Sequence, residues 1–255
     1  MQSIGRVPGH YRPRSGAGRT RTRGMSAMAQ QQDAPDRRIV PLSGLRGIIA
    51  RAMSRAWQAP QVTLGLEFEV GPLLARVRQL GGQGGKVTPT ALVLTALART
   101  LPKHPRMNAL LTEQGIEEVR DVHLAVAVDT ANGLLTPVIR DAHDKGALEI
   151  AAELSILAVQ ARAGKLPPAA YQRGTFTFSN LGGAGIDWVT PVLNPPQVGI
   201  LGMGRCREAV VVRDGTPVAA QVSTLTLVFD HRAIDGMPAS LFLRDLAACL
   251  TAADF

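Results

Sequence analysis

The sequence predicts an α+β fold in which a mixed sheet is flanked by helices. Segments with strand-like alternation and segments with helical spacing both recur along the 255 residues. They do not alternate strictly, as they would in a doubly wound parallel fold. Hydrophobic residues make up 45% of the chain, enough for a sizeable core. No apolar run approaches the roughly 20 residues that span a bilayer, so no membrane segment is expected.

The first part of the folded region begins with an amphipathic helix and a strand. Residues 41–58 carry apolar side chains at helical spacing, and Pro60 ends the helix that they predict. Residues 62–70 alternate between apolar and polar side chains, as a half-buried strand does. A short helix is expected over 71–80. The glycine-rich loop at 81–85 lacks the spacing of a phosphate-binding loop.

The remaining elements mix strands and helices. A helix is expected over 88–105, with the Thr88 hydroxyl as its cap. The longest helix, 147–166, ends before two prolines. The other expected elements are strands at 122–130, 174–180, 198–206 and 219–229, an extended segment at 132–139, and a helix at 237–251.

The net charge of +8 belongs mainly to one end of the chain. Residues 1–32 contain six arginines and no acidic residue, so the other residues carry only +2. We expect residues 1–37 to form a disordered basic tail and residues 38–255 to form one domain. The tail is interpreted as a linker remnant or upstream start, as an organelle transit segment, or as a weak polyanion-binding arm. A cytoplasmic location is expected, or a mitochondrial one if the tail is a transit segment.

His231 is the histidine whose neighbours suggest chemistry. It follows a strand and precedes Asp235 and Gly236 in the stretch VFDHRAIDG. Loops after strands often carry catalytic groups. Gly236 permits a sharp turn, and Asp235 could fix the loop or the ring. The alternative is a histidine that only caps the strand end. No histidine has a partner at metal-ligand spacing and the chain has two cysteines, so no metal is expected.

A second candidate site lies at the end of the strand over 174–180. Ser179 and Asn180 precede a glycine-rich loop, and their hydroxyl and amide groups could face a substrate oxygen. The alternative is an Asx-type turn, which Asn before glycine commonly forms. A diproline at 195–196 forces an extended turn before the next strand and is structural by itself.

These three stretches occur in one order, and together they resemble the dihydrolipoamide acyltransferases, the E2 components of 2-oxo acid dehydrogenase complexes. DHRAIDG resembles the His-x-x-x-Asp-Gly signature that this family shares with chloramphenicol acetyltransferases. GTFTFSNLG and NPPQVGILGMG resemble two further blocks, and three more blocks match in order over residues 38–250. The resemblance implies the E2 catalytic fold, a mixed sheet flanked by helices, with active sites at the interfaces of a homotrimer.

The resemblance also implies a reaction and its residues. An acyl group, most often acetyl, moves between a dihydrolipoamide thiol and coenzyme A, both of which are substrates. His231 matches the general base, and Ser179 of a neighbouring subunit matches the donor to the oxyanion. Asp235 matches a residue that holds the loop by pairing with an arginine, for which Arg55 is the best match. Asn180 and Gly236 are the supporting positions.

The chain departs from the family pattern in several places. No segment resembles a lipoyl or subunit-binding domain, so the lipoyl group is expected from another chain, and E1, E3 or lipoyl-carrying chains are possible partners. Pro60-Gln61 stands where the family has Pro-His, and Gly183-Ala184 stands where it has Met-Phe. Relatives run further at the C-terminus, where apolar residues join trimers, so a trimer is expected rather than a cage.

Two other functions stay open at this point. The chain could be an inactive scaffold or regulatory trimer that assembles with full-length relatives. It could also be a coenzyme A-dependent acetyltransferase for a small hydroxylated acceptor. Nucleic-acid binding through the tail is not favoured, and the pattern does not say which acyl group is transferred.

Overall fold

The computed structural model describes residues 37–82, 86–131 and 133–253. The chain divides into Met1–Pro41 and Leu42–Phe255, and the second unit contains all the described helices and strands. Almost all of the expected basic tail and most of the loop at 81–85 lie outside the described residues. Within the described ranges, no helix has both the length and the apolar character needed to cross a membrane.

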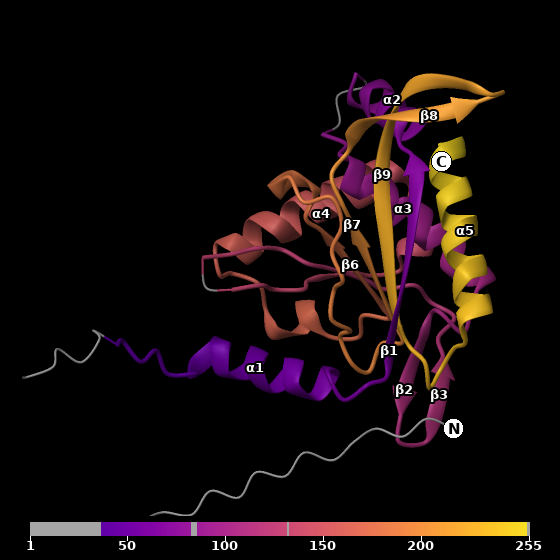
Figure 1. Ribbon diagram of the computed structural model, residues 1–255. Helices are drawn as coiled ribbons and strands as arrows, with labels where there is room; N and C mark the ends of the chain where they lie inside the picture. Colours follow the sequence, from indigo (N-terminus) through magenta and orange to yellow (C-terminus); the bar gives the residue numbers. More distant parts are fainter. Residues whose placement is uncertain (1–36, 83–85, 132, 254–255) are drawn as a thin grey trace, which may run out of the picture. The chain divides into compact units, whose positions relative to one another are not determined.

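The described elements follow the chain as Figure 1 shows. The α-helices are α1 (Gly44–Ala56), α2 (Gly71–Gly81), α3 (Pro89–Thr100), α4 (Ala147–Arg162) and α5 (Gly236–Ala252). The strands are β1 (Gln61–Glu69), β2 (Ala109–Thr112), β3 (Gly115–Glu118), β4 (Leu124–Val126), β5 (Val138–Ile139), β6 (Phe176–Asn180), β7 (Gly199–Met203), β8 (Arg207–Arg213) and β9 (Thr216–Asp230). The short 3-10 helices are η1 (Leu101–Lys103), η2 (Ala142–Asp144), η3 (Pro168–Tyr171) and η4 (Gly182–Ala184).

Seven of the described strands form one mixed sheet. Their order is β1-β9-β7-β6-β4-β5, and β8 pairs with β9. The pairs β4–β6 and β6–β7 are parallel, whereas β1, β7 and β8 all run antiparallel to β9. Strands β2 and β3 form a separate hairpin. This architecture confirms the predicted mixed sheet.

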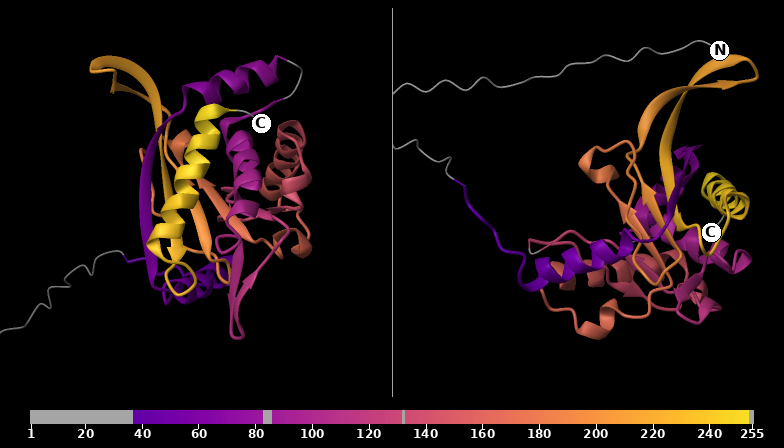
Figure 2. Two further views of the ribbon diagram at one scale, coloured as in Figure 1. Left: turned by 90° about the vertical axis from the view of Figure 1, so that its right-hand side faces the viewer. Right: turned by 60° about the horizontal axis from the view of Figure 1, so that its bottom comes forward.

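The helices α2, α3, α4 and α5 pack against one another and against the sheet, as the turned view in Figure 2 shows. Helix α3 lies between α4 and α5 and has nine buried residues, so it is buried on nearly all sides. The Thr88 hydroxyl accepts a hydrogen bond from the Ala91 N–H at 3.2 Å, which confirms the predicted cap. The main core therefore lies between a layer of helices and one face of the sheet.

Several elements are shorter than their patterns predicted. The first helix covers Gly44–Ala56, and the helix expected over 88–105 passes into η1 after Thr100. The strand expected at 122–130 contributes only the three residues of β4, and the extended segment at 132–139 only the two of β5. Beyond them, an isolated bridge joins Val128 to Leu135. Strands β2, β3 and β8 were not predicted. The sequence of β3, GIEE, lacks the apolar alternation on which strand prediction depends.

We expect Gly204→Ala to destabilise the fold, because the loop 187–196 crosses the backbone there. A Cβ at this position would lie 1.7 Å from the Asp187 carbonyl oxygen, which is a backbone atom. The cost should be about 1–3 kcal/mol of unfolding free energy. Gly65→Ala in β1 is the control, since its Cβ would meet no atom within 4 Å. Urea unfolding measures both variants, and equal midpoints would contradict the expectation.

Candidate active site

His231 lies in the turn between β9 and α5. Its backbone N–H donates to the Pro60 carbonyl at 3.0 Å, and the Ala233 N–H donates to the Asp230 carbonyl at 3.0 Å. The first bond ties the turn to the start of β1, and the second closes the turn on itself. The imidazole is therefore presented from a backbone that is fixed on both sides.

The two neighbours of His231 bind each other. Asp230 is buried, at 4% exposure, and its carboxylate accepts hydrogen bonds from Arg232 Nε at 2.9 Å, Nη2 at 2.5 Å and the backbone N–H at 3.0 Å. The hydrogen bond to Asp230 raises the pKa of Arg232. Since a buried carboxylate without partners would be costly, these three bonds are what allow Asp230 to end the strand inside the protein. Nothing in the sequence pattern had singled out this pair, although its residues flank the histidine.

The imidazole of His231 is accessible to solvent. Its side chain is 44% exposed, and Nδ1 lies 3.7 Å from Asp235 Oδ1. The ring lies 5.9 Å from the ring of Phe229. Because Nδ1 faces a carboxylate, Nε2 is the ring nitrogen available to exchange a proton with a bound molecule. The ring borders a groove of about 420 Å³ that is also lined by Arg106, Glu118, Arg232, Ala233, Ile234, Asp235 and Pro238.

Asp235 and Gly236 mark the start of α5. Asp235 is the N-cap residue, but its side chain makes no capping hydrogen bond and is 83% exposed. Gly236 has no positive φ, and a Cβ there would meet no atom within 4 Å. Within this chain, then, the turn does not use the conformational freedom of glycine that the sequence suggested.

Arg55 lies on another side of the same turn. It lines a pocket of about 150 Å³ together with Asp230, Arg232 and Gln197. Among the described residues, the ion-pair partner of Asp235 is His231. The structure thus brings Arg55 toward Asp230, and the expected pairing of Arg55 with Asp235 stays a prediction.

Ser179 and Asn180 end β6 and differ in how they are engaged. The Asn180 amide donates to Thr90 Oγ1 at 3.0 Å, and its oxygen accepts from the Gly182 N–H at 2.8 Å. This is the Asx-type turn, and it also ties the strand end to α3. The Ser179 hydroxyl, in contrast, makes no hydrogen bond to any residue that the structure describes. Asn180 borders a pocket of about 770 Å³ with Lys86, Thr88 and Arg162.

Within one chain, Ser179 and His231 lie at opposite ends of the sheet. Ser179 pairs with Gly202 of β7, and Gly202 pairs with Thr226 of β9. Since β9 runs antiparallel to β6 and β7, it continues from Thr226 away from Ser179 until it reaches His231. Two strand spacings and five residues of rise separate the two side chains by roughly 20 Å. One chain therefore does not bring the predicted base and the predicted oxyanion donor together.

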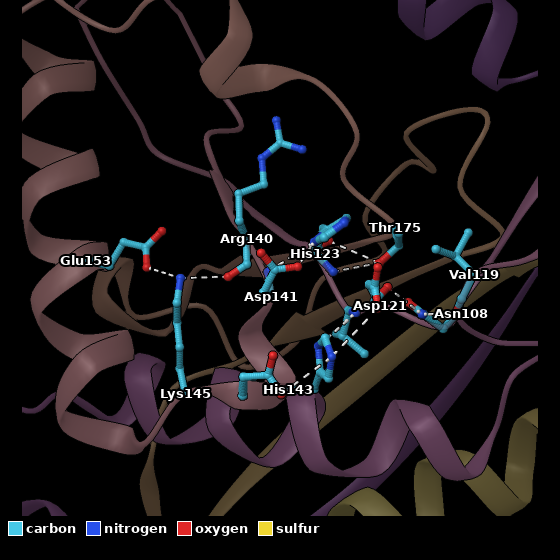
Figure 3. A network of polar contacts seen from close by, with 12 residues as sticks. Asn108, Val119, Asp121, His123, Arg140, Asp141, His143, Lys145, Glu153 and Thr175 are labelled. Carbon is cyan, nitrogen blue, oxygen red and sulfur yellow. Dashed lines mark hydrogen bonds and ion pairs between the residues drawn. The ribbon is translucent and has the colours of Figure 1, made fainter.

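A second polar cluster surrounds His123, as Figure 3 shows. His123 is 8% exposed, and its Nδ1 accepts a hydrogen bond from the Asp141 N–H at 3.1 Å. This bond supports Asp141 in a left-handed conformation, with φ of 44°. Burial lowers the pKa of His123 more than the nearby Asp141 carboxylate raises it. His123 is thus held neutral as a structural acceptor.

The cluster also contains the one group among the described residues that resembles a metal site. Ligand atoms of Asp121, His123 and Asp141 lie within 4.8 Å of one another. However, the Nδ1 lone pair of His123 is already directed at the Asp141 N–H. Asp121 and Asp141 are exposed, and exposed carboxylates of this kind are common without an ion. The arrangement is therefore explained by the hydrogen bonds of the turn.

A family model described as "2-oxoacid dehydrogenases acyltransferase (catalytic domain)" matches residues 34–254. The dihydrolipoyllysine-residue acetyltransferase component of the pyruvate dehydrogenase complex of Bacillus subtilis is 40% identical over 232 residues. That alignment covers 88% of this chain and 52% of the relative. The chain thus spans about half the length of the curated relatives that it matches.

Solved structures show the same fold. The dihydrolipoamide acetyltransferase of Azotobacter vinelandii, studied for the catalytic role of a serine, a histidine and an asparagine, has a TM-score of 0.81 at 34% identity. The alignment covers 86% of this chain and 93% of that one. The cubic core of the pyruvate dehydrogenase multienzyme complex gives a TM-score of 0.82 at 35% identity, with 86% and 93% covered. A chloramphenicol acetyltransferase, 18% identical with a TM-score of 0.53 over 78% of this chain and 94% of that one, shares the fold alone.

We expect acid to destabilise the protein partly through His123. Because burial lowers its pKa, the folded chain stays neutral at His123 while the unfolded chain, with a pKa near 6.5, takes up a proton. The contribution of His123 to the unfolding free energy is therefore fully present above about pH 6.5 and is lost as the pH falls toward the folded pKa. For one proton, the loss is at most about 1.4 kcal/mol per pH unit. His123→Asn, whose amide oxygen can still accept from Asp141, should lose less unfolding free energy between pH 7 and pH 5. If the unfolding free energies of the variant and the wild type changed equally with pH, this role of His123 would be ruled out.

We also expect Arg232→Met to destabilise the protein, because the turn that carries His231 depends on a paired Asp230 carboxylate. The substitution leaves a buried carboxylate without its guanidinium partner, at a cost of about 2–4 kcal/mol of unfolding free energy. The double variant Asp230→Asn/Arg232→Met removes the charge as well, so it should recover part of that loss. A double variant less stable than Arg232→Met would contradict this account.

Proposed function

The chain belongs to the family of 2-oxoacid dehydrogenase acyltransferases, as their catalytic domain, and on this basis we propose that it moves an acyl group between a dihydrolipoyl thiol and coenzyme A. The observation that carries the proposal is the accessible His231 imidazole, held in a closed turn beside a groove of about 420 Å³. The coenzyme and the dihydrolipoyl group are both substrates, and the chemistry needs no metal from this chain.

The spacing of three residues supports the roles assigned to them. In the Azotobacter vinelandii enzyme, the histidine studied lies 52 residues after the serine, and the asparagine lies four residues after the histidine. Ser179, His231 and Asp235 have the same spacing in this chain. We therefore assign the base to His231, the oxyanion donor to Ser179, and the orientation of the imidazole to Asp235, which stands where that enzyme has asparagine.

The first step is activation of the attacking thiol. A free thiol has a pKa near 8.5, so little of it is thiolate at neutral pH. Neutral imidazole accepts the thiol proton at Nε2 as the sulfur attacks the thioester carbonyl. Asp235 Oδ1, at 3.7 Å from Nδ1, faces the ring nitrogen that does not take the thiol proton.

The second step passes through a tetrahedral intermediate. Attack places negative charge on the former carbonyl oxygen, and the free Ser179 hydroxyl donates a hydrogen bond to it. Collapse of the intermediate breaks the bond to the leaving sulfur. The imidazolium returns its proton to that sulfur, so the enzyme regains its starting state.

Both residues can serve one substrate only if two copies of the chain meet. His231 and Ser179 lie at opposite ends of the sheet in one chain, so a neighbouring copy must supply the second residue. We propose a homotrimer, in which each interface joins His231 of one copy to Ser179 of the next. The similarity to the subunit of a cubic core supports assembly through these interfaces, and a larger shell built from trimers is compatible with it.

We propose acetyl as the acyl group. The relatives that share 40% and 41% identity with this chain are acetyltransferase components of pyruvate dehydrogenase complexes. Acetyl-coenzyme A with free dihydrolipoamide is therefore the first substrate pair to test. Activity with a hydroxylated acceptor in place of the dithiol would favour the other acetyltransferase reaction.

We expect His231→Ala to lower kcat by about 10²–10⁴, because the thiol then loses its base. Ser179→Ala should lower kcat by about 10²–10³, because the oxyanion loses a donor. The control is Ser240→Ala, whose hydroxyl bonds within α5 and does not line the groove. Thioester formation from acetyl-coenzyme A and dihydrolipoamide measures all three. A folded, assembled wild type without transfer would favour an inactive scaffold.

We expect the two inactive variants to restore each other when they are mixed. In a cyclic trimer whose sites are shared, equal mixing of His231→Ala and Ser179→Ala chains gives an intact site at about one quarter of the interfaces. The chains are unfolded, mixed and refolded together, and transfer is compared with that of each variant refolded alone. Absence of recovery in correctly assembled mixtures would show that both residues act within one chain.

A further inference from the structure

The Gln61 side chain joins two segments that are distant in the sequence. Its Nε2 donates to the Ala56 carbonyl at 3.0 Å, and its Oε1 accepts from the Leu193 N–H at 3.2 Å. Ala56 ends α1, and Leu193 is a buried residue of the loop 187–196. One amide group thus uses both its donor and its acceptor to hold α1 and this loop against the first residue of β1.

Both residues that Gln61 contacts in this way are buried. Ala56 is fully buried, and its carbonyl accepts from the Ala59 N–H at 3.2 Å as well as from Gln61, which is therefore its second donor. The Leu193 N–H belongs to a loop that packs over β7, where Val189 and Pro191 would lie within 3.2 Å of a Cβ added at Gly202. Leu193 also packs with Ile200 and Val228 in a small apolar cluster on this side of the sheet.

The same position is directly connected to His231. The carbonyl of Pro60, the residue before Gln61, accepts the hydrogen bond from the His231 N–H at 3.0 Å. Gln61 is paired with Asp230, the residue before His231, in the β1–β9 ladder. The Asp230 N–H in turn donates to the Val198 carbonyl, just beyond the loop that Gln61 holds. The start of β1, the end of β9 and the segment that follows the loop 187–196 are therefore tied together around Gln61, next to the His231 backbone.

We propose that Gln61 is a positioning residue that holds the His231 turn in register for acyl transfer. This inference rests on the proposed function for its kinetic consequences, but not for the structural ones. A carboxylate at this position could accept from Leu193 yet would face the Ala56 carbonyl with a second acceptor. An apolar side chain of the same length could make neither bond. The amide is thus the unbranched side chain of this length that satisfies both partners at neutral pH.

The test uses the full chain with Gln61→Met and Gln61→Glu. Gln79→Met is the matched control, because Gln79 is exposed on α2 and bonds only to Arg76 among the contacts described. Acyl transfer from acetyl-coenzyme A to dihydrolipoamide gives kcat and KM. Hydrogen exchange of the His231 and Leu193 amides, and an NMR titration of the His231 imidazole, report on the turn without requiring activity.

We expect Gln61→Met and Gln61→Glu to lower kcat by about 10- to 100-fold with little change in KM, as a small displacement of a catalytic group does. Both variants should speed exchange at His231 and Leu193, whereas the control should match the wild type. Unchanged kcat together with unchanged exchange at His231 would overturn the proposal. If the wild type transfers no acyl group, the proposed function fails, and the exchange rates still decide whether Gln61 holds the turn.

Gln61→His provides a readout that loss of packing alone would not give. A neutral imidazole has one donor and one acceptor and can replace the amide, whereas a protonated imidazole has two donors and cannot accept from Leu193. Exchange at Leu193 should therefore match the wild type at pH 8 and rise as the pH falls below about 6.5. If exchange of the Leu193 amide in Gln61→His changed with pH only as much as it does in the wild type, this would count against a hydrogen-bonding role for Gln61.

Discussion

The direction of β9 is the constraint on which the candidate site depends. This 15-residue strand pairs with β1, β7 and β8, always antiparallel, so its end is fixed relative to every other strand of the sheet. A strand in the middle of a sheet cannot shift by one residue without turning its buried side chains to the wrong face. The position of His231, one residue beyond β9, is therefore set by the packing of the whole core.

Charged groups near His231 are largely paired with one another. Asp230 binds Arg232, and Glu118 on the other wall of the groove accepts a hydrogen bond from Arg106 at 2.9 Å. The remaining acidic group beside the imidazole is Asp235, whose carboxylate is exposed to solvent. The groove thus combines an accessible imidazole with walls whose charges compensate each other.

The sequence predicted the parts of the fold that have strong periodicity, and the position of His231, but not the contacts around it. The buried helix α3 and the strand β9 carry continuous apolar patterns, so they were predictable within a few residues. The β2–β3 hairpin was missed because its residues are short of apolar alternation. Asp230 could not be recognised as a buried partner of Arg232, because the sequence does not show which carboxylates lose contact with water. The wide separation of Ser179 and His231 depends on strand order, which no local pattern contains.

That separation has a consequence for how the protein responds to its own concentration. In the proposed trimer, a single folded chain carries one half of each of two sites, since its His231 and its Ser179 face different neighbours. Dilution that dissociates the copies would then abolish transfer without unfolding any chain, and association would restore it by mass action. Under the proposed assembly, the rate per chain rises with the amount of chain until the copies are fully associated. The number of working sites in a solution is then an equilibrium property and is not fixed by the residues alone.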